Sequence, residues 1–194
     1  MSNKIKLLCE KLLLEIEFKK LDLKIVSEEF DEAKRAFNFE MQRYINALNP
    51  QDRTLVEKRL SQRMQAVNHK SWSNETTKKT SPETRKIFKK IANKTHPDKL
   101  LNKDEDSKEK LTCLYKKAQS AMSEDSLFDT MKLAQELDIE YDMTEDKKLL
   151  LQRELDKINR EIVFIKKTLP WQWKQKGSQR KVVKDFVYGF LIEK

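Results

Sequence analysis

Apolar residues recur every seven positions along residues 4–48, a segment that contains neither Pro nor Gly. A second series fits the partner position of the same heptad, with Lys19 interrupting it. A sustained heptad predicts a long helix packed along another helix, because side chains seven residues apart share one face. Pro50 is expected to end this helix. The first series is Cys9, Ile16, Leu23, Phe30, Phe37 and Tyr44, and the second is Ile5, Leu12, Val26 and Ala33.

The heptad returns between residues 144 and 169, where Pro170 is expected to end the helix. Because two heptad-bearing segments flank a central unit, we expect the terminal helices to pack as an antiparallel coiled coil with that unit inserted between them. Self-association through the same stripes is the main alternative. The repeating positions are Leu151, Ile158 and Ile165 in one series, and Leu155, Ile162 and Leu169 in the other.

Helical spacing also predicts shorter helices elsewhere in the chain. Ser81 and Pro82 form a typical helix start, with Glu83 in the first turn. The polar residues 68–80 are typical of a linker, with Trp72 as its one candidate anchor. We therefore expect an all-α protein with four segments: 1–67 (two helices), 68–80 (linker), 81–143 (a central unit) and 144–194 (coiled-coil helix and amphipathic tail). The predicted shorter helices cover residues 51–67, 82–95, 108–122, 126–137 and 182–192.

The composition supports long, solvent-exposed helices. Charged residues make up 38% of the chain and glycine occurs only twice, which disfavours a sheet-rich fold with many tight turns. The formal charge of +9 is compatible with nucleic acid, an acidic membrane surface or an acidic protein. No apolar run approaches the roughly 18 residues that span a bilayer. Cys9 and Cys113 lack ligand spacing, so a reducing, cytoplasmic compartment is the simplest interpretation.

The segment from Arg85 to Lys99 is a basic helix that ends in the tripeptide His96-Pro97-Asp98. At 100° per residue its apolar and basic residues separate onto opposite faces. The next helix carries a complementary apolar stripe, so the two can pack as a hairpin with the connecting loop exposed. The apolar face consists of Ile87, Phe88, Ile91 and Thr95, the basic face of Lys86, Lys89 and Lys90, and the complementary stripe of Leu111, Tyr115, Ala118 and Met122.

This arrangement resembles the J domain, whose second and third helices form such a hairpin with His-Pro-Asp at its tip. The match covers about residues 81–137, with Phe88 at the family's aromatic position eight residues before the histidine. Tyr115, Ala118, Ala121 and Met122 are similar to the family's third-helix pattern. In its general organisation the chain also resembles short J-like proteins encoded by large DNA viruses and phages. This resemblance would place it in host cytoplasm or in a virion.

The resemblance implies a co-chaperone without catalysis or cofactor of its own. The tripeptide would contact a DnaK-type ATPase chaperone and accelerate its ATP hydrolysis, with Asp98 accepting charge-assisted hydrogen bonds. The basic face would steer encounter with an acidic groove on that ATPase. The residues assigned to partner binding are His96, Pro97, Asp98, Arg85, Lys86, Lys89, Lys90, Lys94 and Lys99.

The chain departs from the standard J domain because it lacks the short first helix with tyrosine, leucine and glycine before Ser81. The glycine-phenylalanine-rich segment and paired-cysteine zinc repeats, the client-binding apparatus of the classical members of the family, are also absent. Either the 51–67 helix supplies the missing packing or the unit is abbreviated. The divergent class that keeps only the J unit is the closest description.

Two other functions remain open. Trp171 and Trp173 interleave with basic residues and could form a stacking and phosphate-contacting patch for nucleic acid, or they could be core residues at the end of the coiled coil. The chain could also be a scaffold whose heptads bind a protein partner and whose J-like unit only packs. Neither a metal-ligand pattern nor a catalytic triad or phosphate loop is found. The basic residues of the patch are Lys174, Lys176, Arg180, Lys181 and Lys184.

Overall fold

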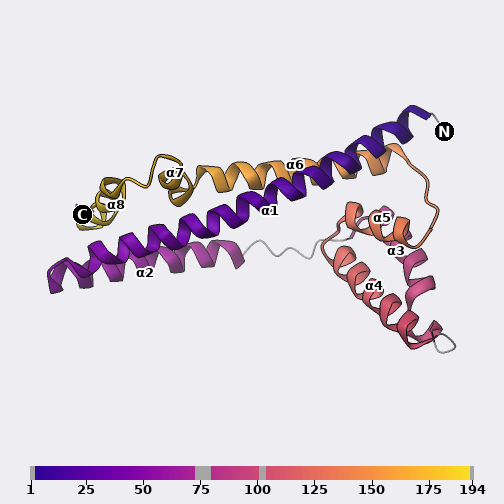
Figure 1. The fold of residues 1–194 in the computed structure, drawn as a ribbon, viewed down its shortest axis with the longest axis horizontal. Coiled ribbons are helices and arrows are strands. Elements are labelled where there is room, and N and C mark those ends of the chain that lie inside the picture. Colours follow the sequence, from indigo (N-terminus) through magenta and orange to yellow (C-terminus); the bar gives the residue numbers. More distant parts are fainter. Residues whose placement is uncertain (1–2, 73–79, 101–103, 193–194) are drawn as a thin grey trace. The chain divides into compact units, whose positions relative to one another are not determined.

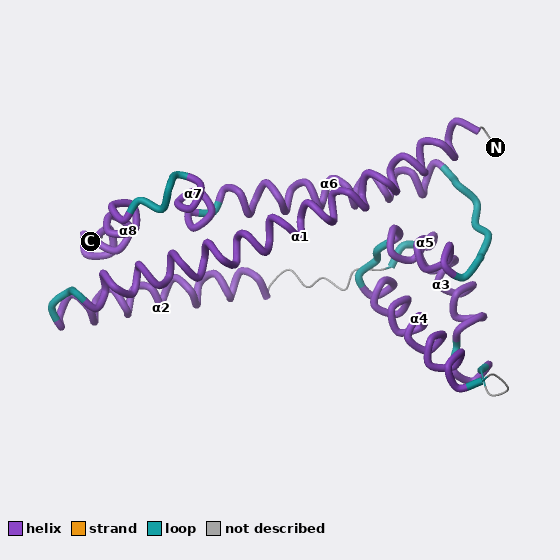
Figure 2. The backbone as a smooth tube through the Cα atoms, viewed as in Figure 1, coloured by secondary structure: helices purple, strands orange, loops and turns teal. Residues whose placement is uncertain are grey.

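The structure, a computed structural model, describes residues 3–72, 80–100 and 104–192, with backbone alone for 64–72 and for 192. This part of the chain is all helical and contains no strand, which confirms the predicted fold class (Figures 1 and 2). In chain order the helices are α1 (Asn3–Asn46), α2 (Pro50–Trp72), α3 (Pro82–Thr95), the 3-10 turn η1 (Pro97–Lys99), α4 (Glu105–Ser123), α5 (Leu127–Glu136), α6 (Glu145–Lys167), α7 (Leu169–Gln175) and α8 (Arg180–Ile192).

The chain divides into two compact units that each combine distant segments. The first comprises residues 1–20 and 77–159, and the second comprises residues 21–76 and 160–194. Both α1 and α6 contribute to the two units, because each helix continues past the division.

The heptad faces of α1 and α6 are turned away from solvent. On α1, Cys9, Ile16 and Phe37 are buried, and no residue of the two predicted heptad series is exposed. On α6, Leu151 and Ile158 are buried in the same way, together with Leu155, Ile162 and Ile165. The predicted core positions of both helices are thus confirmed.

The two helices run in the same direction, so the predicted antiparallel orientation is wrong (Figure 1). Near the start of α1, burial raises the pKa of the Cys9 thiol, and Glu145 at the start of α6 raises it further. Eleven residues along α1, Lys20 lies close enough to Glu154 of α6 to oppose the increase in that residue's pKa caused by burial. A heptad stripe has the same spacing in both directions, so it could not determine this orientation.

In the first unit, α3, α4 and α5 pack against one another (Figure 1). Helix α5 is the central element, because most of its apolar residues are buried. Its N-terminus is capped by Ser126, whose hydroxyl accepts the Asp129 N–H, and by Glu154 of α6, whose carboxylate accepts the Phe128 N–H at 2.9 Å. The buried residues of α5 are Leu127, Phe128, Thr130, Met131, Leu133 and Ala134.

Two ion pairs join residues 17–20 of α1 to α5. Lys20 donates to both carboxylate oxygens of Asp129 at 2.7 and 2.6 Å, and its ammonium lies 4.6 Å from the centre of the Phe128 ring. Lys132 donates to Glu17 at 2.7 Å. This part of α1 is therefore attached to the helix that supports α3 and α4.

In the second unit, α2 packs on α8. Ile45, Val56, Val187 and Phe190 form one buried cluster, and the guanidinium of Arg63 lies 4.7 Å from the centre of the Phe190 ring. Val56 and Leu60 of α2 are therefore used in this core.

Several helix ends differ from their predicted positions. Helix α1 ends at Asn46, before Pro50, and Pro50 instead begins α2, where the Asn49 carboxamide accepts the Asp52 N–H at 2.9 Å. Helix α2 continues to Trp72, so residues 68–72 are helix and not linker, while residues 73–79 of that linker and the Trp72 side chain lie outside the described structure. Pro170 lies in the first turn of α7, a position where its missing N–H costs nothing.

Candidate functional site

Local capping positions helix α3 as the sequence predicts. The Ser81 hydroxyl accepts the Thr84 N–H at 3.1 Å, and Pro82 occupies the first turn. The Ser81 N–H donates to the Asp125 carboxylate at 2.8 Å, and Asp125 has a positive φ of 53° in the turn between α4 and α5. The start of α3 is therefore held by its own cap and by the far end of the helix that follows the tripeptide.

The tripeptide forms the tight turn that ends α3. The His96 N–H donates to the Ala92 carbonyl at 2.9 Å, after which the backbone of His96 becomes extended, as a residue before proline requires. Residues Pro97–Lys99 make one 3-10 turn, and Leu100 is buried beneath it. The side chain of Asp98 is 87% exposed, so its carboxylate faces solvent from an ordered backbone.

Aromatic contacts from both helices orient the His96 side chain. Its ring lies edge-on to Tyr115 of α4, with centroids 5.2 Å apart, and Tyr115 in turn lies 6.3 Å from Phe88 of α3. The His96 Nδ1 atom accepts the Asp98 N–H at 3.3 Å and lies 3.6 Å from the Asp98 carboxylate. The tripeptide is held by ring packing and by its own backbone.

The basic residues of α3 have different surroundings. Lys86 donates to Glu83 at 2.7 Å, and this hydrogen bond raises the pKa of Lys86 and lowers that of Glu83. Glu83 also lies 3.5 Å from Lys147, a buried lysine whose ammonium additionally donates to the Asp142 carbonyl. The charge of Lys86 is therefore balanced within its own helix.

Lys90 and Lys94 bind the end of α5 and the loop after it. Lys90 donates to the Glu140 carbonyl at 2.8 Å, and Lys94 donates to the Leu137 carbonyl at 2.9 Å. The carbonyls at a helix C-terminus lack backbone partners, so an ammonium there stabilises the end of α5. Both lysines, which the sequence assigned to partner binding, thus also hold the unit together.

Arg85 and Lys89 remain as exposed cations on α3, and neither makes an ion pair with any residue that the structure describes. By helix geometry, Arg85, Lys89 and His96 fall within about 40° of one another around the α3 axis. Lys99 donates to the Asn93 carboxamide at 3.0 Å. The structure therefore places two unpaired positive charges on the same face as the tripeptide histidine.

Three residues that support this unit were not identified from the sequence. Lys147, Glu154 and Asp129 are buried or half-buried and bind partners far away in the chain. In the sequence they are ordinary charged residues of helical segments, and no spacing distinguishes them from their neighbours.

Trp171 and Trp173 are core residues. Both are buried, and Trp173 packs edge-on against Phe37 with centroids 5.5 Å apart while its indole N–H donates to the Gln179 carbonyl at 2.9 Å. Two of the neighbouring cations already lie near acids: Lys174 donates to Glu32 at 2.8 Å, and Arg180 lies 3.8 Å from Glu40. The tryptophans therefore cannot stack on bases in this conformation.

No helix of the described residues is both long and apolar enough to cross a membrane. Within the same residues, no three side chains of His, Cys, Asp or Glu gather as a metal site would require. Comparison of the chain with protein-family models, curated proteins and solved structures gives no match. The resemblance to the J domain therefore rests on the tripeptide, its flanking pattern and the geometry around it.

Proposed function

We propose that this chain is a J-domain co-chaperone that binds a DnaK-type ATPase chaperone and stimulates its ATP hydrolysis. The observation that carries the proposal is the position of His96-Pro97-Asp98 between the packed helices α3 and α4, with the Asp98 carboxylate exposed. A carboxylate on an ordered turn can accept charge-assisted hydrogen bonds from an arginine of the partner. Because the turn is already ordered, binding costs less conformational entropy than it would from a mobile loop.

The cations of α3 supply the second part of the proposed surface. Arg85 and Lys89 are exposed and lie on the face of the tripeptide histidine, so they can attract an acidic groove on the ATPase. The other three cations of α3 already donate to acceptors within the unit: Lys86, Lys90 and Lys94. They contribute to the positive electrostatic potential of this surface more than to specific contacts with a partner. We therefore expect Arg85 and Lys89 to matter most for association.

Helix α5 supports the hairpin from its own position after α4. It packs on both α3 and α4 and is itself fastened by Glu154 and by the ion pair of Lys20 with Asp129. In this proposal the unit is an abbreviated J domain that depends on the long helices for support. The buried heptad faces of α1 and α6 favour their packing as a parallel coiled coil. The compartment would be that of the chaperone, the cytoplasm.

Single-turnover ATP hydrolysis by a DnaK-type chaperone, with and without the full chain, tests this proposal. We expect the chain to accelerate hydrolysis and His96→Gln to remove the acceleration. The matched control is His69→Gln, which changes the only other histidine, in α2, and should leave the acceleration intact. Failure of the unaltered chain to accelerate hydrolysis by chaperones from several hosts would contradict the proposal, as would equal loss in both variants.

A further inference from the structure

One segment of the chain carries most of its net charge. Between Glu161 and Asp185 there are seven basic residues and no acidic residue, so this segment supplies seven of the nine net positive charges. The basic and acidic residues of the rest of the chain nearly balance. A concentration of one sign of charge attracts a partner of the opposite sign. The seven residues are Lys166, Lys167, Lys174, Lys176, Arg180, Lys181 and Lys184.

Most of these cations have no acidic partner. Lys174 donates to Glu32, and Arg180 lies 3.8 Å from Glu40. The other five are exposed, and none of them makes an ion pair with a residue in the described ranges. Their charge is therefore available to another molecule. The five residues are Lys166, Lys167, Lys176, Lys181 and Lys184.

On α8 two of the available cations share a face with an exposed ring. Lys181, Lys184 and Tyr188 fall within about 60° of one another around the helix axis. Tyr188 is 40% exposed, and the Lys184 ammonium lies 5.5 Å from the centre of its ring. Lys181 lies in the first turn of α8, where the helix dipole opposes a cation, so helix stability does not account for its charge. This face combines unpaired positive charge with an accessible aromatic ring.

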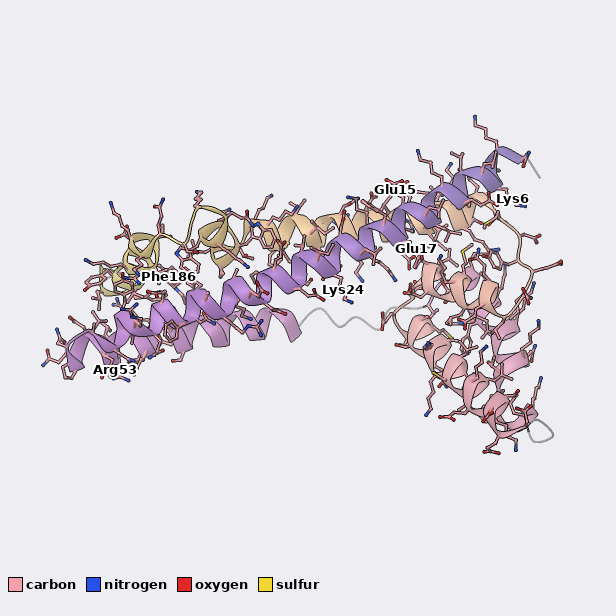
Figure 3. All side chains as sticks on the ribbon, in the orientation of Figure 1. Lys6, Glu15, Glu17, Lys24, Arg53 and Phe186 are labelled. Carbon is pink, nitrogen blue, oxygen red and sulfur yellow. The ribbon has the colours of Figure 1, made fainter. Side chains whose placement is uncertain are left out.

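The opposite face of α8 is buried in the core. Phe186 points toward α1, as Figure 3 shows, and its ring centroid lies 5.7 Å from that of Phe37. Val183 and Phe190 are also buried, more than about 120° from the centre of the exposed face. A helix that binds a membrane surface inserts its apolar face among the lipids. Because the apolar face of α8 is already covered, the helix offers a partner its charges and Tyr188.

These groups match the chemistry of single-stranded nucleic acid. Every nucleotide carries a negative phosphate, and lysine contacts phosphate as a point charge. Six of the seven cations in the segment are lysines. An unpaired base has a flat face that stacks on an aromatic ring. An acidic protein would instead need a packed apolar anchor, whereas the exposed face of α8 presents the single ring of Tyr188.

We propose that the basic segment 166–184, together with Tyr188, binds single-stranded nucleic acid. The exposed lysines would contact phosphates, and a base would stack on the Tyr188 ring. The ring of Tyr188 would serve in place of the neighbouring Trp171 and Trp173, which are buried. This cationic surface differs in chemistry from the tripeptide, whose exposed group is a carboxylate. It would give the chain a second binding activity that does not involve a chaperone.

Titration of a labelled oligothymidine of about 20 nucleotides with the full chain tests the proposal. Fluorescence anisotropy measures the association constant at salt concentrations from about 50 to about 200 mM. For four or five phosphate contacts, the logarithm of this constant should fall linearly with the logarithm of the salt concentration, with a slope of about −3.

Charge variants locate the binding surface. Lys181→Glu combined with Lys184→Glu should weaken binding about tenfold or more and make the salt slope shallower by about 1.4, since two contacts are lost. The matched control is Lys4→Glu combined with Lys11→Glu, which changes the net charge equally at two exposed lysines of α1. The control should bind like the unaltered chain. Circular dichroism should show equal helicity in both variants, because all four side chains are exposed.

Ring variants test the stacking contact. Tyr188→Ala should weaken binding about fivefold or more, whereas Tyr188→Phe keeps the ring and should retain binding. The matched control is Phe18→Ala, which removes a 61% exposed ring whose centre also lies 5.5 Å from a lysine ammonium, that of Lys19. Glu15 and Glu17 lie beside Phe18 on α1 (Figure 3), so that ring is poorly placed for a phosphate chain. Its loss should not change binding.

Absence of binding, equal loss in either control, or unchanged binding in Tyr188→Ala would overturn the proposal. Phosphatidylserine vesicles and poly-glutamate serve as competitors at equal negative charge. If the vesicles compete better than unlabelled oligothymidine, the surface binds membranes, and if poly-glutamate does, it binds an acidic protein; either result contradicts the proposal. None of these measurements involves ATP or a chaperone, so their failure is separate from failure of the co-chaperone proposal.

Discussion

The imidazole of His96 lies edge-on against the phenol ring of Tyr115, with ring centroids 5.2 Å apart and an interplanar angle of 75°. This contact joins the residue that ends α3 to the middle of α4. Because Tyr115 also contacts Phe88, the orientation of the tripeptide histidine depends on both helices of the hairpin. The geometry of the loop is thus a property of the hairpin core.

Tyr115→Ala should therefore weaken ATPase stimulation by the tripeptide, although the tripeptide residues themselves are unchanged. Loss of the ring leaves His96 free to rotate and removes an aromatic contact worth about 0.5–1.5 kcal/mol. We expect reduced stimulation of the chaperone ATPase together with a modest drop in the melting temperature. Tyr115→Phe keeps the ring and should retain both properties, so a loss of stimulation in the Phe variant would contradict this role of the ring contact.

Asp98→Asn should abolish ATPase stimulation while leaving stability nearly unchanged. The side chain is 87% exposed, and substitutions at such positions usually change the free energy of unfolding by no more than about 0.5 kcal/mol. Loss of the ionised acceptor removes the charge-assisted contact to the partner. Thermal denaturation and single-turnover hydrolysis measure the two effects. Asp185→Asn, an exposed acid of α8, is the matched control; equal stimulation by the Asp98 variant and the unaltered chain would refute the assigned role.

The lysines and arginine of α3 should separate into two groups. Replacing Lys90 and Lys94 by Ala removes their hydrogen bonds to the end of α5, which should cost about 0.5–1 kcal/mol of unfolding free energy for each. Replacing Arg85 and Lys89 by Ala should leave stability unchanged and slow association with the chaperone, most strongly at low salt. Urea denaturation and stopped-flow association provide the two readouts, and the reverse pattern would show that the assignment is wrong.

Glu154 should make stability depend on pH in an unusual direction for an acid. Burial raises its pKa above the ordinary value, so the folded state binds a proton more tightly than the unfolded state does. The contribution of this group to stability is therefore present below the unfolded pKa and is lost as the pH rises through the folded pKa. Glu154→Gln keeps an acceptor for the Phe128 N–H and lacks this dependence.

Denaturation of both proteins at about pH 4.5 and about pH 7 tests that expectation. The free energy of unfolding of the Gln variant, relative to that of the unaltered chain, should rise between the two pH values. A relative fall over this range would mean that the hydrogen bonds from Phe128 and Ser126 and the charge of Lys20 outweigh burial, and that Glu154 stabilises the fold as an anion.

The sequence by itself determined the elements that depend on neighbours a few residues apart. The cap at Ser81, the stop at Pro97 and the buried heptad positions of α1 and α6 all follow from spacings of three, four or seven residues. The tripeptide at the end of a basic helix also follows from that local pattern. The predictions were confirmed for features that depend only on one helix and its caps.

Tertiary structure alone decided the relative direction of α1 and α6 and which charged side chains bind groups elsewhere in the same chain. A heptad has no polarity, so only the folded chain shows that α1 and α6 run in parallel. Lys90 and Lys94 resemble other lysines in the sequence, yet each binds a carbonyl that another segment supplies, and Lys147 lies 3.5 Å from Glu83 of α3. The burial of Trp173 against Phe37 likewise joins residues far apart in the chain. Such contacts depend on long-range packing, which no local spacing encodes.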